Sequence, residues 1–296
     1  MIHLIKHSML AITLSTSTTL AAPPATSTSD TETVPIEASV TYKQVPLDAP
    51  SASDKRSLRI DWTRPADWQA SDARGAVVFF HGGGWVGGKP GQFAEHSTAL
   101  ADLGLVCFRV EYRLLDRKNG EPPTDCVEDA SDAMRFIRGS AKRFGIDPHR
   151  IACGGGSAGG HLAAYLGMMD DEEVDGVSRK ADALLLFNPV YDNGPGQWGA
   201  KRVGEQTDQY SPAHNITSDD PPAIVFLGES DALIPMATAE RFQQRSQQAD
   251  LVSELHTYPD QPHGFFNVHV ADGKYFDDTL GKSIAFLKRL GWMDAK

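Results

Sequence analysis

The chain has 296 residues, of which 41% are hydrophobic and 23% are charged, and its formal net charge is −11. This length fits one α/β domain of about 250 residues with a short tail. The acidic balance argues against nucleic acid and anionic membrane surfaces as partners, and it favours neutral or weakly charged substrates. The three cysteines, Cys107, Cys126 and Cys153, are not closely spaced. Neither a disulfide framework nor a zinc site is therefore expected, although a pairing of Cys126 stays open.

The first 22 residues resemble a secretory signal peptide. A positive charge at Lys6 precedes an apolar run that reaches Leu14, and small residues follow up to Ala22. The segment is too short for a transmembrane helix. Residues 23–38 are rich in Pro, Thr and Ser and are predicted to be a linker. A secreted or periplasmic protein is expected, with a disordered N-terminal tail as the alternative.

The remaining residues, 39–296, are predicted to form one globular domain. Polar and apolar residues alternate over 40–45 and 58–62, which is typical of half-buried strands. Buried strands are expected at 76–80, 105–110, around Ile151, at 183–187 and 223–227, with a last strand at 253–258. Helices are expected at 92–103, 124–144, from Ala158, at 235–249 and 275–290. Strands that alternate with helices predict an α/β fold with a mostly parallel eight-stranded sheet covered on both faces.

One long stretch, 189–222, has no clear strand. It contains several Gly and Pro residues together with Tyr191, Trp198 and Tyr210. A loop of this length is predicted to be either a lid insertion over the site or a packed surface excursion.

The motif around Ser157 organises the chain. Gly155-Gly156-Ser157-Ala158-Gly159 fits G-x-S-x-G, the pattern of a serine on a strained turn between a strand and a helix. Gly155 and Gly159 are needed because a Cβ at either position would collide where the helix passes over the strand. The pattern alone is weak evidence, but the predicted strand before it and helix after it support a nucleophilic serine.

A second glycine cluster, His81-Gly82-Gly83-Gly84, directly follows the strand predicted at 76–80. We refer to residues 81–84 as the oxyanion loop. In such a sheet this position lies at the carboxyl edge, where sites assemble. The N–H groups of Gly83, Gly84 and Ala158 are the candidate donors to a developing oxyanion. His81 is expected to brace the loop through hydrogen bonds.

A carboxylate and a histidine follow the last two predicted strands. Asp231 is the candidate acid, with Glu229 as its rival, and His263 is the candidate base. The order Ser157, Asp231, His263 is that of the α/β hydrolases. His161 is expected to pack near the serine turn, and Asp260 to be solvated.

From about Ser39 to its end, the chain resembles the α/β-hydrolase family. The residues His81 to Gly88, which read HGGGWVGG, and Val110 to Leu114, which read VEYRL, resemble bacterial carbohydrate-esterase-like proteins such as acetylxylan and feruloyl esterases. The resemblance implies an α/β-hydrolase fold with a small cap or none. It also implies that His263 takes the proton of Ser157, that Asp231 orients the imidazole, and that no metal or organic cofactor is needed.

The function expected from the sequence is that of a serine carboxylesterase. It would release short acyl groups, such as acetyl, from a small-molecule or polysaccharide ester of plant or algal origin. Trp85 and Trp198 are candidates for stacking on sugar rings, with ordinary packing as the alternative. The alternatives are a general short-chain carboxylesterase or lipase-like enzyme, a peptidase of the same fold, and a non-catalytic binding protein. Oligomeric state does not follow from the sequence.

Overall fold

The computed structural model describes residues 37–46 and 55–293. The predicted signal peptide lies outside these residues. The predicted linker does too, except for residues 37 and 38, which already belong to the first strand.

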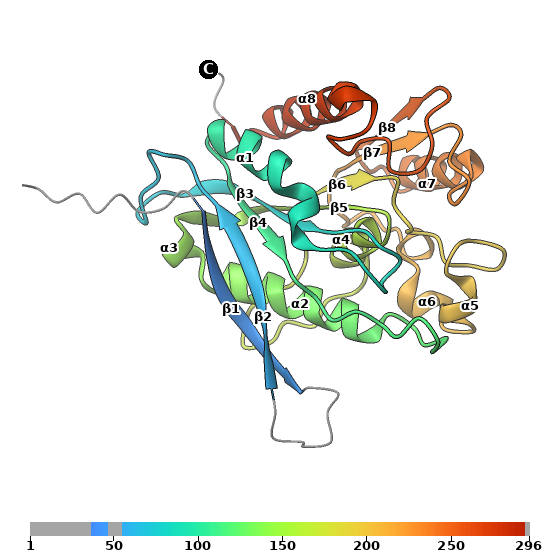
Figure 1. Cartoon of the computed structure of the whole chain (residues 1–296), viewed down its shortest axis with the longest axis horizontal. Coiled ribbons are helices and arrows are strands. Elements are labelled where there is room, and N and C mark those ends of the chain that lie inside the picture. The colour runs from blue at the N-terminus through green and yellow to red at the C-terminus, as the bar shows by residue number, and fades with distance from the viewer. Residues whose placement is uncertain (1–36, 47–54, 294–296) are drawn as a thin grey trace, which may run out of the picture. The chain divides into compact units, whose positions relative to one another are not determined.

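The domain is built on one eight-stranded sheet, as predicted (Figure 1). The strand order is β1-β2-β4-β3-β5-β6-β7-β8. The pairs β1–β2 and β2–β4 are antiparallel and the remaining pairs are parallel. The strands are β1 (Glu37–Pro46), β2 (Lys55–Thr63), β3 (Arg74–Phe80), β4 (Val106–Val110), β5 (Ile146–Gly156), β6 (Ala183–Phe187), β7 (Ala223–Gly228) and β8 (Ser253–Tyr258).

The five predicted helices are present between the strands or after the last of them, and two short helices within residues 189–222 were not predicted. The α-helices are α1 (Ala94–Asp102), α2 (Thr124–Gly139), α3 (Ala141–Phe144), α4 (Ala158–Met168), α5 (Ala200–Val203), α6 (Thr207–Tyr210), α7 (Met236–Gln248) and α8 (Lys274–Arg289). Single 3-10 turns are η1 (Pro90–Phe93), η2 (Pro212–His214) and η3 (Ala271–Gly273). The helix predicted over 124–144 is interrupted at Ser140, where the backbone leaves the helical region at φ −102° and ψ 18°. Gly139 and Ser140 are poor helix formers, which explains the break.

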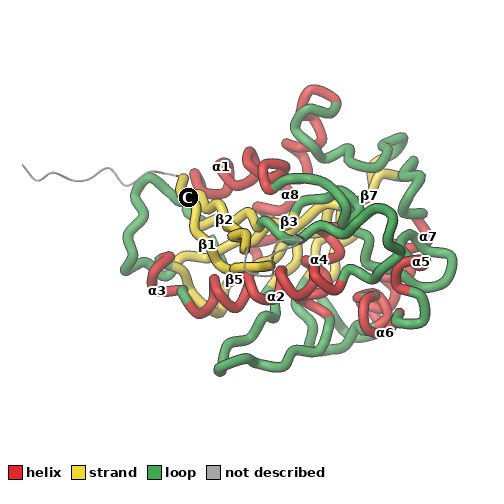
Figure 2. The backbone as a smooth tube through the Cα atoms, turned by 60° about the horizontal axis from the view of Figure 1, so that its bottom comes forward, coloured by secondary structure: helices red, strands yellow, loops and turns green. Residues whose placement is uncertain are grey.

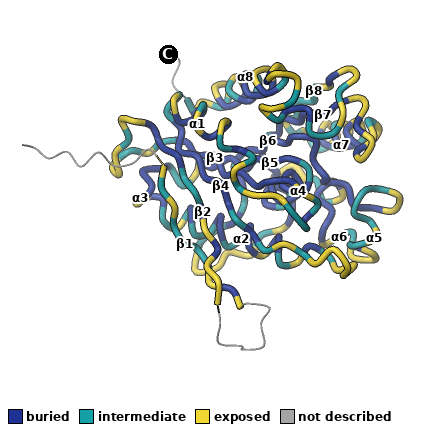
Figure 3. The backbone as a smooth tube through the Cα atoms, in the orientation of Figure 1, coloured by how far each residue is buried: buried dark blue, intermediate teal, exposed yellow. Residues whose placement is uncertain are grey.

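Side chains of the sheet alternate between two apolar cores. Along β3, Val78 and Phe80 join the core under α2, α4 and α7, whereas Val77 and Phe79 join the core under α1 and α8. Figure 2 shows the sheet between these helical layers, and Figure 3 shows that its central strands are buried. A strand that is buried on both faces is a continuous apolar run, which explains why these strands were predictable.

The loops that follow β3, β5, β6, β7 and β8 open at one edge of the sheet, because these strands are parallel. The residues proposed from the sequence as catalytic lie in these loops. This edge therefore contains the candidate site, as expected for a parallel sheet.

All three cysteines are buried and free. No helix among the described residues is both long enough and apolar enough to cross a membrane.

Candidate active site

Ser157 lies on a strained turn between β5 and α4. Its backbone has φ 54° and ψ −117°, and its N–H donates to the carbonyl oxygen of Phe187 at 2.9 Å. A Cβ on Gly155 would overlap the backbone of Gly159, and a Cβ on Gly159 would overlap the carbonyl oxygen of Phe80. The structure thus confirms why glycine is required on both sides of the serine.

A line of hydrogen bonds joins Ser157, His263 and Asp231. The distance from Ser157 Oγ to His263 Nε2 is 2.9 Å, and His263 Nδ1 lies 2.7 Å from Asp231 Oδ2. The side chain of Asp231 is fully buried, and its Oδ1 accepts the N–H groups of Leu233 and Ile234 at 2.8 and 3.0 Å. A carboxylate can only accept, so Nδ1 carries the proton and the Nε2 lone pair faces the serine hydroxyl.

The rival carboxylates lie elsewhere. Glu229 is exposed and accepts a hydrogen bond from Thr257 Oγ1 at 2.9 Å. Asp260 is exposed in a turn with φ 61°. Of the acidic residues weighed from the sequence, only Asp231 contacts the imidazole.

The oxyanion loop presents free backbone donors beside Ser157. Gly83 and Gly84 have φ values of 121° and 63°, which favour glycine. Within the described part of the chain, the N–H groups of Gly83, Gly84 and Ala158 have no hydrogen-bond acceptor. The N–H of Ala158 also belongs to the first turn of α4, where the helix dipole favours negative charge. These donors are therefore available to an anion at the serine.

His81 braces the oxyanion loop from behind, as predicted. Its ring stacks on Tyr112 with the ring centroids 4.3 Å apart, and its Nδ1 lies 2.8 Å from the carbonyl oxygen of Gly82. The Tyr112 hydroxyl donates to the carbonyl oxygen of His81 at 2.7 Å. Burial lowers the pKa of His81, so the neutral ring donates from Nδ1.

His161 packs near the serine turn, also as predicted. Its Nε2 donates to the carbonyl oxygen of Tyr210 at 2.7 Å, and burial lowers its pKa to about 4. It meets Trp85 edge-on with the ring centroids 5.0 Å apart. His161 thus links α4 to the 189–222 segment.

The interpretation of Trp85 as a residue that stacks on sugar is wrong. Its side chain is 0% exposed, because the ring is enclosed by His161 and Trp198. Trp85 fills the core behind the oxyanion loop, which is the packing alternative. Trp198, in contrast, lines the cavity at Ser157.

The cavity at Ser157 has a volume of about 390 Å³. His263 and the oxyanion loop form one part of its lining, while Trp198, Leu233 and Phe266 supply apolar surface. A larger hollow of about 660 Å³ contains no member of the hydrogen-bonded line. That hollow is lined by Arg74 and Gly104, which precede or begin strands, so it lies at the other edge of the sheet.

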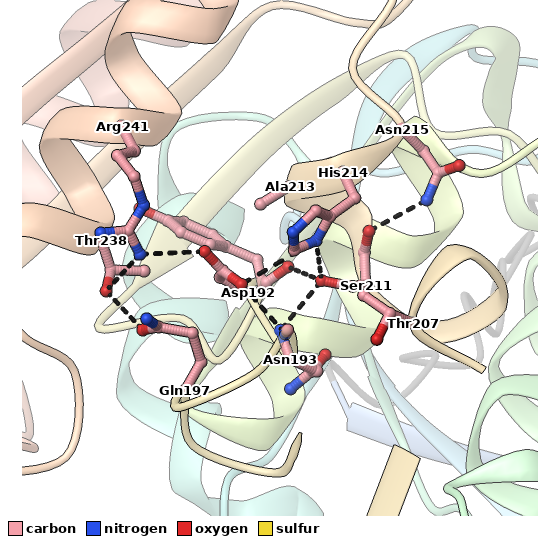
Figure 4. A network of polar contacts seen from close by, with 12 residues as sticks. Asp192, Asn193, Gln197, Thr207, Ser211, Ala213, His214, Asn215, Thr238 and Arg241 are labelled. Atoms are coloured by element: carbon pink, nitrogen blue, oxygen red, sulfur yellow. Dashed lines mark hydrogen bonds and ion pairs between the residues drawn. The ribbon is translucent and has the colours of Figure 1, made fainter. Parts of the chain in front are cut away.

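The 189–222 segment is tied to α7 through polar contacts (Figure 4). Arg241 contacts the buried carboxylate of Asp192 at 3.1 Å, and Thr238 donates to Gln197 at 2.9 Å. Asn193 Nδ2 donates to the carbonyl oxygen of Trp198 at 3.0 Å. These contacts favour the packed-excursion alternative over a lid that moves.

Four further polar side chains of the cavity were not singled out from the sequence: Lys89, Gln92, Asn188 and Asn267. Asn188 directly follows β6 at the same edge as the other site residues, so its position could have drawn attention to it. Gln92 lies in η1 and Asn267 in the loop after β8, and neither belongs to a recognisable motif.

The sheet, the serine turn and the hydrogen-bonded line together define an α/β hydrolase. The family model BD-FAE matches residues 63–185. The chain is 36% identical to Thermogutta terrifontis esterase 2. The structure of that esterase phosphoramylated by tabun superposes with a TM-score of 0.80 over 88% of this chain and 97% of that one. It is 30% identical over 224 residues to the probable carboxylic ester hydrolase LipM of Mycobacterium tuberculosis, covering 66% of this chain and 50% of the relative. It is 28% identical over 207 residues to an acetylxylan esterase of Xylanibacter ruminicola, covering 64% of this chain and 41% of the relative.

The chain belongs to the esterase family of the α/β hydrolases. Its homologues and structural neighbours include carboxylic ester hydrolases. The chain spans half or less of the length of the two curated relatives described above.

Proposed function

We propose that this protein is a serine carboxylesterase that hydrolyses short-chain acyl esters through an acyl-enzyme. The observation that carries the proposal is the line from Ser157 Oγ to His263 Nε2 at 2.9 Å and from His263 Nδ1 to Asp231 at 2.7 Å. In this proposal Ser157 is the nucleophile, His263 the general base and Asp231 the residue that orients the base.

The acylation step begins when Ser157 Oγ attacks the ester carbonyl carbon and passes its proton to His263 Nε2. The carbonyl π electrons move to the oxygen, and the N–H groups of Gly83, Gly84 and Ala158 stabilise the resulting oxyanion. The C–O bond to the alcohol then breaks, and His263 returns the proton to the leaving oxygen. The buried carboxylate of Asp231 stabilises the imidazolium between these two transfers.

Deacylation repeats the same transfers with water. His263 takes one proton from a water molecule, whose oxygen attacks the acyl carbon. The bond between the acyl carbon and Ser157 Oγ then breaks, and His263 returns the proton to Oγ. The products are the carboxylic acid and the regenerated hydroxyl. Apart from the ester and water, each step uses only the residues described here.

We propose acetyl and similarly short acyl groups as substrates, carried on plant or algal polysaccharides or oligosaccharides. A cavity of about 390 Å³ with an apolar wall from Trp198, Leu233 and Phe266 leaves room for a short acyl chain. The match to BD-FAE and the similarity to an acetylxylan esterase support a carbohydrate ester. Trp198 is proposed to contact the sugar. Secretion through the signal-like segment at residues 1–22, which lies outside the described residues, is part of this proposal.

Hydrolysis of p-nitrophenyl acetate by the wild type, Ser157→Ala and Ser218→Ala tests the activity. Ser218 is an exposed serine on the surface and serves as the matched control. We expect Ser157→Ala to lose at least about 1,000-fold in kcat and Ser218→Ala to match the wild type. Full activity in Ser157→Ala would refute the assignment of the nucleophile.

The substrate requires a separate test. The rates on p-nitrophenyl acetate, butyrate, octanoate and laurate are compared, together with acetate released from acetylated xylan. We expect the highest kcat/KM on acetate or butyrate and release of acetate from the glycan. The highest kcat/KM on laurate, or no release of acetate from acetylated xylan, would contradict the proposed substrate. Neither result would contradict the proposed esterase chemistry.

A further inference from the structure

We infer that Gln92 and Asn267 are positioning residues that tie the oxyanion loop to the loop that carries His263. This inference rests on the proposed esterase function and concerns the same site. Both side chains line the cavity around Ser157, yet neither takes part in the proton transfers.

The side-chain amide of Gln92 bridges the two loops. Its Oε1 accepts the N–H of Gly82 at 2.6 Å, and its Nε2 donates to Asn267 Oδ1 at 3.0 Å. Gln92 belongs to η1, whereas Asn267 comes 175 residues later in the chain. One amide therefore holds two distant segments at a fixed separation.

Asn267 extends this connection to the histidine loop. Its Nδ2 donates to the carbonyl oxygen of Gly264 at 2.7 Å, and its backbone N–H donates to the same oxygen at 3.2 Å. The N–H of Gly264 donates to Asn188 Oδ1 at 3.1 Å, and Asn188 Nδ2 lies 3.3 Å from His263 Nε2. The chain of contacts thus reaches from the oxyanion loop to the catalytic imidazole.

The groups at the two ends of this connection determine the direction of each hydrogen bond within it. The N–H of Gly82 can only donate, and the carbonyl of Gly264 can only accept. Gln92 must therefore present its oxygen to Gly82 and its nitrogen to Asn267, which in turn presents its oxygen to Gln92. Neither amide can flip without placing two like groups face to face, so the connection specifies one arrangement of the two loops.

The position of Gly82 determines where the next two N–H groups lie. A Cβ on Gly82 would lie 2.9 Å from the carbonyl oxygen of Gly156, so the oxyanion loop passes close to the serine turn. Loss of the Gln92 acceptor leaves the buried N–H of Gly82 unsatisfied and allows the loop to shift. A displacement of about 1 Å at such donors costs about 100-fold in rate.

The test compares the wild type with Gln92→Met, Asn267→Ala and the double variant. Methionine keeps the length of glutamine and removes its hydrogen bonds, and Gln244→Met on the exposed face of α7 is the matched control. Rates on p-nitrophenyl acetate are expressed per active site, counted by covalent titration with an organophosphonate. Melting temperatures show which variants fold. If Gln92→Met does not fold, the comparison of Asn267→Ala with the wild type tests the inference.

We expect Gln92→Met to lower kcat/KM by about 10- to 100-fold with KM changed by less than about 3-fold. We expect the kcat/KM of the double variant to lie within about 3-fold of that of the less active single variant, because both residues act through one connection. Gln244→Met should match the wild type.

A trifluoromethyl ketone separates positioning from simple structural support. Ser157 Oγ adds to its carbonyl carbon while the hydroxyl proton passes to His263, which leaves an oxyanion at the proposed donors. Its inhibition constant should rise in proportion to the fall in kcat/KM.

Two results would overturn the inference: a Gln92→Met variant equal to the wild type per active site, or a variant with fewer titratable sites but an unchanged inhibition constant. If the wild type hydrolyses no ester and the phosphonate does not label Ser157, the proposed function fails instead.

Discussion

His96 makes the stability of the domain depend on pH in a way that can be measured. Its ring is 2% exposed and lies among the rings of Phe79, Phe93, Phe187, Phe266 and Phe276. Neither ring nitrogen has a hydrogen-bond partner in the described structure. Burial lowers the pKa of His96 from 6.5 to about 3, because the charged ring cannot be solvated there.

The sign of the effect follows from proton linkage. Below pH 6.5 the unfolded chain binds a proton at His96 that the folded chain does not bind, so stability falls as the pH drops towards 3. At pH 5 the difference between the two pKa values lowers the free energy of unfolding by about 2 kcal/mol relative to pH 7.5. The variant His96→Leu removes this loss, and it also removes two unsatisfied polar atoms from the core.

Urea unfolding at pH 7.5 and pH 5.0, followed by tryptophan fluorescence, measures the difference. From pH 7.5 to pH 5.0 the free energy of unfolding should fall in both proteins. We expect this fall to be about 2 kcal/mol smaller in His96→Leu than in the wild type. His161 retains its own pH dependence in both proteins, since burial also lowers its pKa, to about 4. The control is His269→Leu, at an exposed histidine, which should preserve the wild-type difference.

An identical drop in stability for His96→Leu and the wild type would refute this reasoning. It would mean that water or a rearrangement of the phenylalanine rings solvates the charged imidazole in the folded state. A gain that is equal at both pH values would identify apolar packing, not protonation, as the effect of the substitution.

Three further predictions concern the site. Asp231→Asn should lower kcat on p-nitrophenyl acetate by about 1,000- to 10,000-fold, because it disturbs the tautomer of the base. Glu229→Gln should have no effect, and equal losses in both variants would contradict the choice of Asp231 as the acid. Gly159→Ala should not yield a folded, active protein, since the new methyl group would overlap the carbonyl oxygen of Phe80; a soluble variant with normal melting and activity would show that the close approach is absent. Trp198→Ala should raise kcat/KM on hexanoate relative to acetate by about 10-fold, because it removes part of the cavity wall; an unchanged ratio would mean that this ring does not limit the acyl chain.

Most of the fold follows from local patterns. The buried strands are apolar runs bounded by turns, and the apolar face of α2, formed by Val127, Ala130, Met134 and Ile137, lies in the core. The break at Ser140 was not predicted. The spacing of apolar residues stays helical across this point, although Gly139 and Ser140 are poor helix formers.

The candidate site could be predicted where its residues directly follow strands of the sheet. Ser157, Asp231 and His263 each follow a predicted strand, and a parallel sheet places such residues at one edge. Their catalytic roles remain predictions, but the structure brings the three side chains together. For Trp85 the sequence left both stacking on sugar and ordinary packing open, because its neighbours in sequence are glycines of the site. Its neighbours in space, His161 and Trp198, favour packing.

The polar bridge through Gln92 and Asn267 could not be derived in this way. Each residue is an ordinary amide in a loop, and their meeting depends on the packing of segments 175 residues apart. Only the folded chain shows that an amide in η1 faces one in the loop after β8.

The sheet order has a consequence for how the protein is made. Ser157 leaves the ribosome 106 residues before His263, which follows β8, an edge strand of the sheet. Since domains are synthesised from the N-terminus, a nascent chain holds Ser157 without its base until synthesis has passed His263. Hydrolytic activity thus requires that β8 and the loop after it have been made and folded, and it can report on the folding of this edge of the sheet during expression.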